Sequence, residues 1–201
     1  MVKQAIYLGA MLALMAVVLV GCKKKNSNSN TEVPDISGKH QIEITVKDYG
    51  TIKAELDADT APITVDNFLK LAKEGFYDGL TFHRIIEGFM IQGGDPKGNG
   101  TGGSDQTIKG EFSSNGVKNE LSHVRGTISM ARSQAKDSAS SQFFIVHQDS
   151  TYLDGEYAAF GTVTEGMEIV DQICADAKVE DSNGTVSKEN QPIIESIKVI
   201  E

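Results

Sequence analysis

The chain has 201 residues, of which 39% are apolar, and its formal net charge is −9. This length suits one domain and a short tail. A protein that binds duplex DNA needs a positively charged stripe to displace counterions from the phosphates. The acidic balance, without a long basic cluster, therefore predicts no nucleic-acid partner.

The N-terminal segment differs from the rest of the chain. After Lys3, residues 5–20 carry no charge and are almost wholly apolar. A positive flank before a short apolar core is typical of a signal peptide, whereas a membrane-spanning helix needs about 20 apolar residues. The segment ends in Leu19-Val20-Gly21-Cys22, which resembles the cleavage box of bacterial lipoprotein signal peptides. This resemblance implies removal of residues 1–21 and lipid attachment to the Cys22 thiol. A secretory signal with an unmodified Cys22 is the alternative.

A lipidated Cys22 predicts a protein anchored to a membrane of the bacterial cell envelope, on its extracytoplasmic side. Residues 22–38 are polar and poor in core-forming side chains, which predicts a flexible tether. Lys23 to Lys25 either meet anionic lipid headgroups or simply make the spacer basic. The folded domain then occupies residues 39–201. Cys174 has no disulfide partner once Cys22 is lipidated.

Beyond the tether, short strands and two isolated helices follow in chain order. Alternating apolar residues at 42–46 and 52–56, with a turn between them, predict a β-hairpin. Thr60 is placed to cap a helix over residues 62–74. Further strands are expected at 81–86, 89–92, 126–131, 142–146, 158–163 and 193–200, and a second helix at 166–176. Many short strands without βαβ alternation favour a closed antiparallel barrel or a sandwich.

Three common kinds of site lack support in the sequence. The glycine-rich stretch 93–103 contains the spacing G-x-G-x-x-G, but not between a strand and a helix, so a surface loop is favoured over a nucleotide site. The four histidines lie far apart without ligand spacing, and we expect no metal. No serine lies in a G-x-S-x-G elbow, which argues against a hydrolase of that type.

The most specific signal is the run of residues 82–95. In an alternating strand Arg84 and His83 face opposite ways, and an inward arginine needs an acceptor. Two large apolar side chains and an amide follow, which are Phe89, Met90 and Gln92. An arginine beside an apolar pocket with one amide predicts a ligand site.

This run is followed by four further motifs, which are Asn99 to Gly103, Ile128 to Ala131, Ser141 to Ile145, and Leu153 to Gly155 with Phe160-Gly161. Together, and in this order, they resemble the cyclophilin-type peptidyl-prolyl isomerases over nearly all of residues 40–201. The resemblance implies a mainly β fold, a closed eight-stranded antiparallel β-barrel capped by two α-helices. It also implies isomerisation of X-Pro bonds in proline-containing polypeptides. We expect a monomer that uses no cofactor.

The implied reaction breaks no covalent bond, because it only rotates an amide over a barrier of about 18–20 kcal/mol. A catalyst needs a pocket for the proline ring and a donor that favours the twisted amide. By position in the motifs, the resemblance implies that Arg84 is the catalytic residue. The residues implied to contact substrate are Phe89, Met90, Gln92, Gly100, Ala131, Arg132, Gln142, Phe144, Tyr152, Leu153 and Tyr157. Phe143, which alternates with Phe144, is expected in the core.

Some positions depart from the family pattern or have a supporting role. His83 is expected to support the site by packing or by a hydrogen bond, since no proton transfer is required. Tyr157 stands where many relatives have histidine, and its hydroxyl can still donate into the pocket. Tyr152 replaces the tryptophan of cyclosporin-sensitive members, and Arg132 an often-found asparagine. The expected role is the folding of exported proteins at the envelope. A binding module or chaperone with little required turnover is the alternative.

Overall fold

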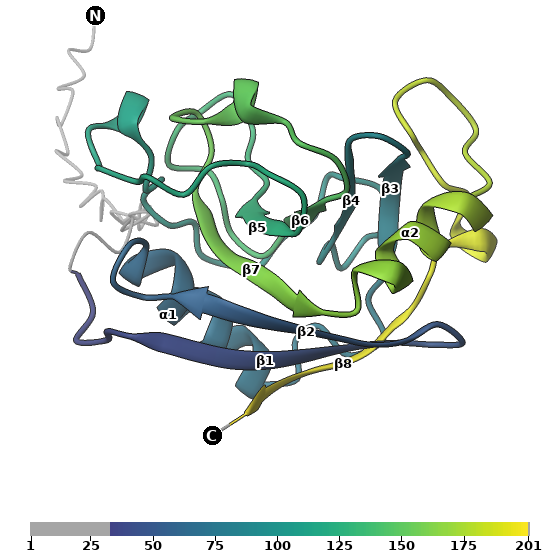
Figure 1. Ribbon diagram of the computed structural model, residues 1–201, viewed down its shortest axis with the longest axis horizontal. Helices are drawn as coiled ribbons and strands as arrows, with labels where there is room; N and C mark the ends of the chain where they lie inside the picture. The colour runs from purple at the N-terminus through teal and green to yellow at the C-terminus, as the bar shows by residue number, and fades with distance from the viewer. Residues whose placement is uncertain (1–32, 201) are drawn as a thin grey trace, which may run out of the picture.

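The computed structural model describes residues 33–200. The predicted signal peptide, Cys22 and most of the tether lie outside these described residues. Within them the chain forms eight strands and two α-helices (Figure 1), with bounds β1 Lys39–Val46, β2 Gly50–Asp57, α1 Pro62–Lys73, β3 Phe82–Ile86, β4 Met90–Gly93, β5 Thr127–Met130, β6 Phe143–Val146, β7 Ala159–Glu165, α2 Met167–Asp176 and β8 Ile194–Ile200. Three short 3-10 helices are η1 Ser113–Asn115, η2 Thr151–Leu153 and η3 Lys188–Asn190.

The predicted hairpin is formed by β1 and β2. Their register pairs Ile44 with Ile52, and the alternate side chains on this face are buried, as the sequence pattern predicts. Asp48 and Gly50 in the connecting turn both have positive φ angles. An aspartate tolerates this conformation better than most residues, and glycine adopts it freely.

All eight strands belong to one antiparallel sheet with the order β3-β4-β6-β5-β7-β2-β1-β8. The sheet curls into an open half-barrel, so the predicted closure of the barrel is wrong. Among the described residues β3 and β8 form no ladder with each other, and the two ends of the sheet meet at an isolated bridge between Thr81 and Ile193. The reason is that the loop between α2 and β8 occupies the outer edge of β3. There Arg84 bridges Thr185, and the Ile85 amide donates to the Gly184 carbonyl at 2.8 Å.

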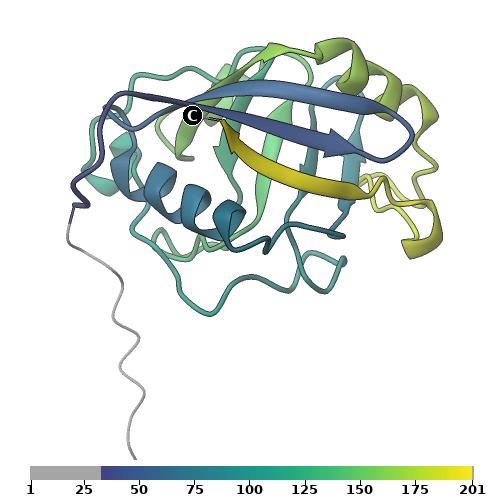
Figure 2. The same ribbon diagram turned by 90° about the horizontal axis from the view of Figure 1, so that it is seen from below.

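The two helices lie at opposite ends of the sheet (Figures 1 and 2). Helix α1 begins with Pro62, and its buried face carries the predicted apolar stripe of Val65, Phe68, Leu69 and Ala72. The predicted cap is wrong, because the Thr60 hydroxyl donates to Asp57 instead. The buried Glu111 carboxylate caps the helix from a distant loop. It accepts from the amides of Ile63 and Thr64 at 3.1 and 2.8 Å.

Aromatic side chains fill the space between α1 and the sheet. The ring of Phe68 stacks on Tyr77 at 5.0 Å and meets Phe143 edge-on at 5.3 Å. Phe143 has no exposed surface, so its predicted place in the core is confirmed. Because side chains alternate along β6, the next residue, Phe144, points to the opposite face of the sheet. This alternation places Phe144 outside the core.

Among residues 33–200, no helix combines the length and the apolar character that crossing a membrane requires.

Candidate active site

A second apolar cluster lies apart from the main core. Its buried members are Met90, Phe144 and Val146, and partly buried Ile86, Phe89, Ala131, Leu153 and Tyr157 pack against them. These residues come from β3, β4, β6 and η2, and from the loops that follow β3, β5 and η2. A face of a sheet that lacks a covering layer normally carries polar side chains. An apolar cluster in this position is therefore a candidate binding surface.

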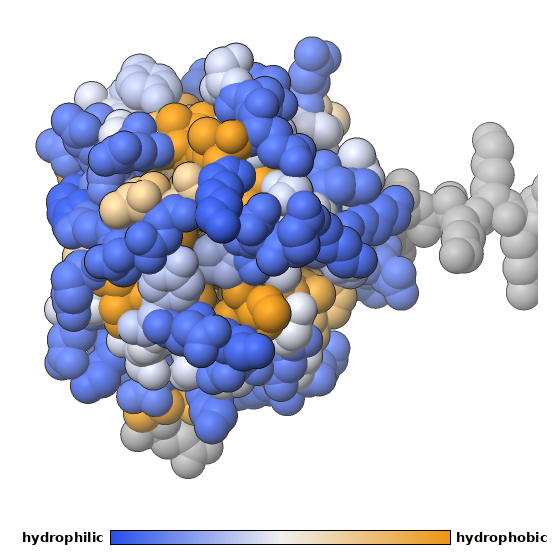
Figure 3. Space-filling model, turned by 90° about the vertical axis from the view of Figure 1, so that its right-hand side faces the viewer, coloured by the Kyte–Doolittle hydropathy of each residue, from blue (hydrophilic) through white to orange (hydrophobic). Residues whose placement is uncertain are grey.

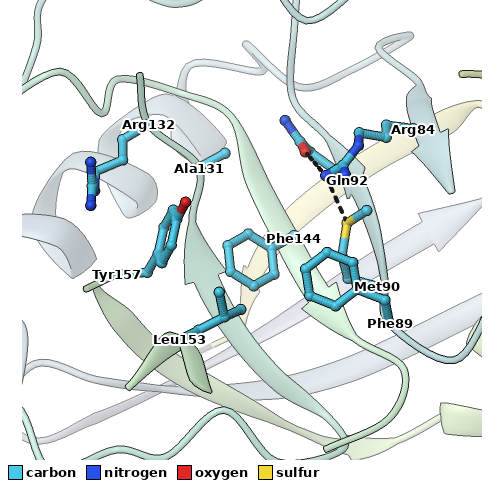
Figure 4. Close-up of a pocket in the computed structure, with 9 residues that line it drawn as sticks. All are labelled: Arg84, Phe89, Met90, Gln92, Ala131, Arg132, Phe144, Leu153 and Tyr157. Atoms are coloured by element: carbon cyan, nitrogen blue, oxygen red, sulfur yellow. Dashed lines mark hydrogen bonds between the residues drawn. The ribbon is translucent and has the colours of Figure 1, made fainter. Parts of the chain in front are cut away.

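The cluster forms the floor of a cavity of about 140 Å³. Its lining residues, drawn in Figure 4, are Arg84, Phe89, Met90, Gln92, Ala131, Arg132, Phe144, Leu153 and Tyr157. All nine were predicted from the sequence. The volume is close to that of the roughly 150 Å³ apolar cavity that takes up benzene, so a five-membered ring fits.

Arg84 stands at the rim of this cavity, opposite Gln92 in the β3–β4 register. Its Nε donates to the carbonyl oxygen of Asn183 at 2.8 Å, and Nη1 donates to Gln92 Oε1 at 3.3 Å. The guanidinium carbon lies 5.8 Å from the centre of the Phe89 ring. Burial lowers the pKa of Arg84, although a guanidinium stays protonated in proteins. Among the described residues Nη2 has no hydrogen-bond acceptor, which leaves this donor for a ligand.

Two glutamines connect Arg84 to the glycine-rich loop. Gln92 Nε2 donates to Gln142 Oε1 at 2.9 Å, and Gln142 Nε2 donates to the Gly102 carbonyl at 2.7 Å. Gln142 also reaches the Gly100 carbonyl at 3.2 Å. Because each amide oxygen accepts and each amide nitrogen donates, this chain fixes the orientation of Gln92 and, through it, of Arg84.

Gly100 and Gln142 were predicted as substrate contacts, and they line a separate, adjacent cavity of about 350 Å³. This cavity is polar, with Ser133, Ser138 and Ser140 in its wall. It shares three residues with the apolar cavity, which are Gln92, Ala131 and Arg132. A chain that entered the apolar cavity would continue into the polar one.

Arg132 lines both cavities, but its guanidinium is engaged within the protein. Nε and Nη2 donate to the Glu156 carbonyl at 3.0 and 2.9 Å, and Nη1 donates to the Ser133 carbonyl at 2.9 Å. The guanidinium carbon lies 5.0 Å from the ring centre of Phe112 and 4.7 Å from that of Tyr157. Arg132 therefore holds Tyr157 and the cavity wall in place, and its charge is directed away from the cavity (Figure 4).

Two further predicted site residues lie outside the apolar cavity. Tyr152 is 71% exposed, and its ring centre lies 6.0 Å from that of Phe89, at the edge of the site. His83 faces away from Arg84 and is buried at 4% exposure, and burial lowers its pKa. Neither ring nitrogen of His83 has a hydrogen-bond partner in the described part of the chain. Of the two supports expected from His83, packing is present and the hydrogen bond is not.

One group behind the cavity, the pair of His123 and Asp154, was not predicted from the sequence. His123 is fully buried and lies parallel to the Phe144 ring at 6.0 Å. Its Nδ1 is 2.8 Å from Asp154 Oδ1, and its Nε2 is 3.0 Å from Ser129 Oγ. Burial lowers the pKa of His123 against the opposing effect of Asp154. A serine next to a histidine and a carboxylate resembles the arrangement that activates a nucleophilic serine. Ser129, however, has no exposed surface, so it supports the cavity floor instead.

Three isolated residues, at 123, 129 and 154, share no local pattern, so no spacing signal identifies this group.

Within residues 33–200, no three His, Cys, Asp or Glu side chains lie close enough together to hold a metal ion.

The arrangement combines an apolar cavity of ring size with a charged donor held at its rim. Such a site can bind a proline ring and offer a hydrogen bond to the amide nitrogen, whose lone pair becomes available as the amide twists. The donor interacts more strongly with the twisted amide than with the planar one, which is the condition for lowering the barrier.

Comparisons with known proteins agree with this chemistry. The family model for cyclophilin type peptidyl-prolyl cis-trans isomerases matches residues 41–199. Peptidyl-prolyl cis-trans isomerase B of Bacillus subtilis is 48% identical over 144 residues, which are 72% of this chain and 92% of that protein. Peptidyl-prolyl cis-trans isomerase A of Dickeya dadantii is 42% identical over 161 residues, which are 75% of this chain and 80% of that protein.

The crystal structure of a cyclophilin type isomerase from Cryptosporidium parvum is also similar, with a TM-score of 0.72 and 31% identity over 82% of this chain and 99% of that one. A second structure of that protein, determined in the presence of the dipeptide Ala-Pro, has a TM-score of 0.71 over 80% of this chain and 99% of that one. The chain belongs to the cyclophilin-type peptidyl-prolyl cis-trans isomerase family.

Proposed function

We propose that this isomerase assists the folding of exported proteins at the bacterial cell envelope, held there by a lipid on Cys22, and that Arg84 is its catalytic residue. The proposed location is supported by the sequence of residues 1–22, with its positive flank, short apolar core and terminal cysteine. The proposed catalytic role is supported by the position of Arg84 at the rim of the apolar cavity.

In the proposed mechanism, the proline ring sits on Phe144 between Met90 and Leu153, where burial of the ring provides binding energy. Arg84 Nη1 is already engaged by Gln92, so Nη2 is the donor for the twisting amide. As the amide loses its planarity, the nitrogen lone pair becomes an acceptor, and the hydrogen bond from Arg84 strengthens. The reaction therefore requires neither a nucleophile nor a proton transfer.

The residues that precede proline are proposed to follow the polar cavity beside Ala131 and Gln142. This assignment is supported by continuity, because the two cavities share Gln92, Ala131 and Arg132. Tyr157 borders the apolar cavity, where its hydroxyl can donate to a bound peptide.

Mass spectrometry of the protein purified from membranes tests the anchor. We expect an N-terminus at an acylated Cys22, and a Cys22→Ala variant that leaves the membrane fraction. A mature N-terminus at Lys23, or a retained Met1, contradicts the anchor.

Refolding of an exported client limited by prolyl isomerisation tests the role. The detergent-solubilised parent should accelerate refolding, and Arg84→Ala should not. If Arg84→Ala protects the client from aggregation and supports its folding as well as the parent does, the protein acts as a binding module or chaperone instead.

A further inference from the structure

The loop that covers the outer edge of β3 contains a tight turn at residues 180–186, which we call the 180–186 turn. Asp181 organises this turn: Oδ1 accepts from the amides of Asn183 and Thr185 at 2.9 and 3.1 Å, and Oδ2 accepts from the Thr185 hydroxyl at 2.9 Å. The Glu180 amide closes the turn by donating to the Thr185 carbonyl at 2.7 Å. These hydrogen bonds lower the pKa of Asp181. The turn thus has a defined shape although Asp181 is exposed.

The 180–186 turn is attached to β3 by backbone contacts on both sides of Arg84. The Ile85 amide donates to the Gly184 carbonyl at 2.8 Å, and the Val186 amide donates to the His83 carbonyl at 3.1 Å. Gly184 has a φ angle of +78°, and a Cβ atom there would collide with the Ile85 carbonyl oxygen. Glycine at this position allows the turn to approach β3 closely.

This attachment places the Asn183 carbonyl oxygen 2.8 Å from Arg84 Nε. Nε and Nη1 lie on different edges of the planar guanidinium. The acceptors on Asn183 and Gln92 therefore fix the orientation of the guanidinium plane together. The remaining donor, Nη2, is then held in one position on a side chain that lines the cavity. A displacement of about 1 Å in a catalytic group can cost up to about 100-fold in rate.

We propose that Asp181 is a positioning residue for Arg84, and that it acts by holding the Asn183 carbonyl where Arg84 Nε can donate to it. The inference rests on the proposed catalytic role of Arg84. The 180–186 turn thereby links a loop outside the sheet to the isomerase site. A loop that only covers the edge of β3 would need the backbone contacts but not the Asp181 side chain.

Three variants of the full-length chain test this role, with activity on a prolyl peptide and the Nε–H signal of Arg84 in NMR spectra as readouts. Asp181→Ala removes both carboxylate oxygens and the three hydrogen bonds that they accept, and we expect kcat to fall about tenfold, with a shifted Arg84 signal. Asp181→Asn keeps an oxygen for the two amides and offers an amide nitrogen to the Thr185 hydroxyl, so activity and signal should be restored to within about twofold.

Glu180→Gln is the matched control. Glu180 precedes Asp181 and carries the same charge, but its carboxylate makes no hydrogen bond or ion pair with any residue from 33 to 200, so activity and signal should stay at the parent level. A change equal to that in Asp181→Ala would show that charge, rather than the turn, is responsible, and would overturn the proposal. Equal losses in Asp181→Asn and Asp181→Ala would overturn it as well.

Arg84→Ala separates this inference from the role on which it rests. An inactive Arg84→Ala with a fully active Asp181→Ala overturns only the positioning role. A fully active Arg84→Ala overturns the catalytic role of Arg84 itself.

Discussion

Arg84 and Arg132 border the same apolar cavity, and their surroundings differ in one respect. Arg84 donates from Nε and Nη1, and among residues 33–200 it has no acceptor for Nη2. Arg132 donates from all three nitrogens to backbone carbonyls, and it lies between Phe112 and Tyr157. A guanidinium with an unused donor can act on a ligand, whereas one with every nitrogen engaged stabilises the wall. The role of each arginine depends on the acceptors that the fold supplies.

The largest expected effect is that of Arg84→Ala on catalysis. Removing one donor that acts on the transition state costs about 100- to 1,000-fold in kcat, and we expect a loss of at least 100-fold in kcat/KM for a prolyl peptide. The free energy of unfolding should change by only about 1 kcal/mol, because the side chain is half-buried and its hydrogen bonds to Asn183, Gln92 and the weakly accepting Met90 sulfur all go to neutral acceptors. Urea unfolding monitors stability alongside the isomerase assay.

Arg84→Lys is the control for charge. A lysine cannot satisfy the Asn183 and Gln92 acceptors while directing a third donor to the cavity, so most of the loss should remain. Activity near the parent level in Arg84→Lys would contradict the importance of guanidinium geometry.

Arg132→Ala should show the opposite balance between stability and activity. The variant loses its hydrogen bonds to Glu156 and Ser133 and its contacts with two aromatic rings, and we expect the free energy of unfolding to fall by about 2–3 kcal/mol. We expect kcat/KM to fall by about tenfold or less, through the loosened Tyr157. A 100-fold loss of activity at unchanged stability would make Arg132 a direct substrate contact and would end the contrast with Arg84.

Two buried histidines also differ in their hydrogen-bond partners. His123 is hydrogen-bonded to Asp154 and Ser129, and His83 has no partner for either nitrogen among the described residues. Replacing an unpartnered polar group by an apolar one removes a cost of burial, so His83→Leu should raise the free energy of unfolding by about 1 kcal/mol at pH 7. His123→Leu should lower it by about 2 kcal/mol, because Ser129 loses its partner.

The two buried histidines should also make the free energy of unfolding depend on pH. Burial lowers the pKa of His83 and of His123, so the folded protein binds protons more weakly than the unfolded chain does. Their contribution to stability is complete above the ordinary histidine pKa of about 6.5 and is lost as the pH falls below it. Urea unfolding between pH 7.5 and 5 should show this loss, and His83→Leu should show a smaller one. Replacing the partly exposed His40 by Gln is the control. If the free energy of unfolding of His83→Leu changed with pH as steeply as that of the parent, this account would be contradicted.

The smallest expected effect is that of Tyr152→Ala. Tyr152 is 71% exposed, and its ring makes a tilted contact with Phe89 at the edge of the site. We expect kcat/KM to change by less than about threefold, with stability within about 0.5 kcal/mol of the parent. Leu153→Ala, which shortens a side chain in the cavity wall, is the matched comparison and should raise KM more. A larger fall in kcat/KM in Tyr152→Ala would show that Tyr152 contacts the substrate directly.

Much of the fold follows from local patterns. Alternation in β1 and β2 and the apolar stripe of α1 identify elements whose buried faces agree with the structure. Closure of the barrel was predicted wrongly, because the edge of β3 pairs with Thr185 in a loop whose sequence carries no strand pattern. The cap on α1 was also predicted wrongly. Its acceptor, Glu111, is 48 residues from Ile63 in the chain, and no local rule connects them.

For the site, the family resemblance identified every residue that lines the apolar cavity, because one strand pair and two loops carry most of them in short runs. What the motifs did not reveal was how each side chain is engaged. The full use of Arg132 by backbone carbonyls and the contact of Arg84 with Asn183 both depend on acceptors that are distant in sequence. Backbone acceptors leave no trace in residue identity, so sequence patterns cannot report them.

The order of residues is enough to predict that this acidic chain forms a mainly β domain with two helices, and that an arginine, an amide and a set of large apolar residues lie together in a site. Alternation and helical spacing are local properties, and they are written directly in the order of residues. The open sheet, and the arginine whose Nη2 has no acceptor among residues 33–200, are consequences of tertiary packing. Tertiary packing also places His123 under the floor of the cavity and leaves His83 without a hydrogen-bond partner in the described part of the chain. Each of these depends on hydrogen-bond acceptors brought together from distant parts of the chain, whose positions exist only in the folded protein.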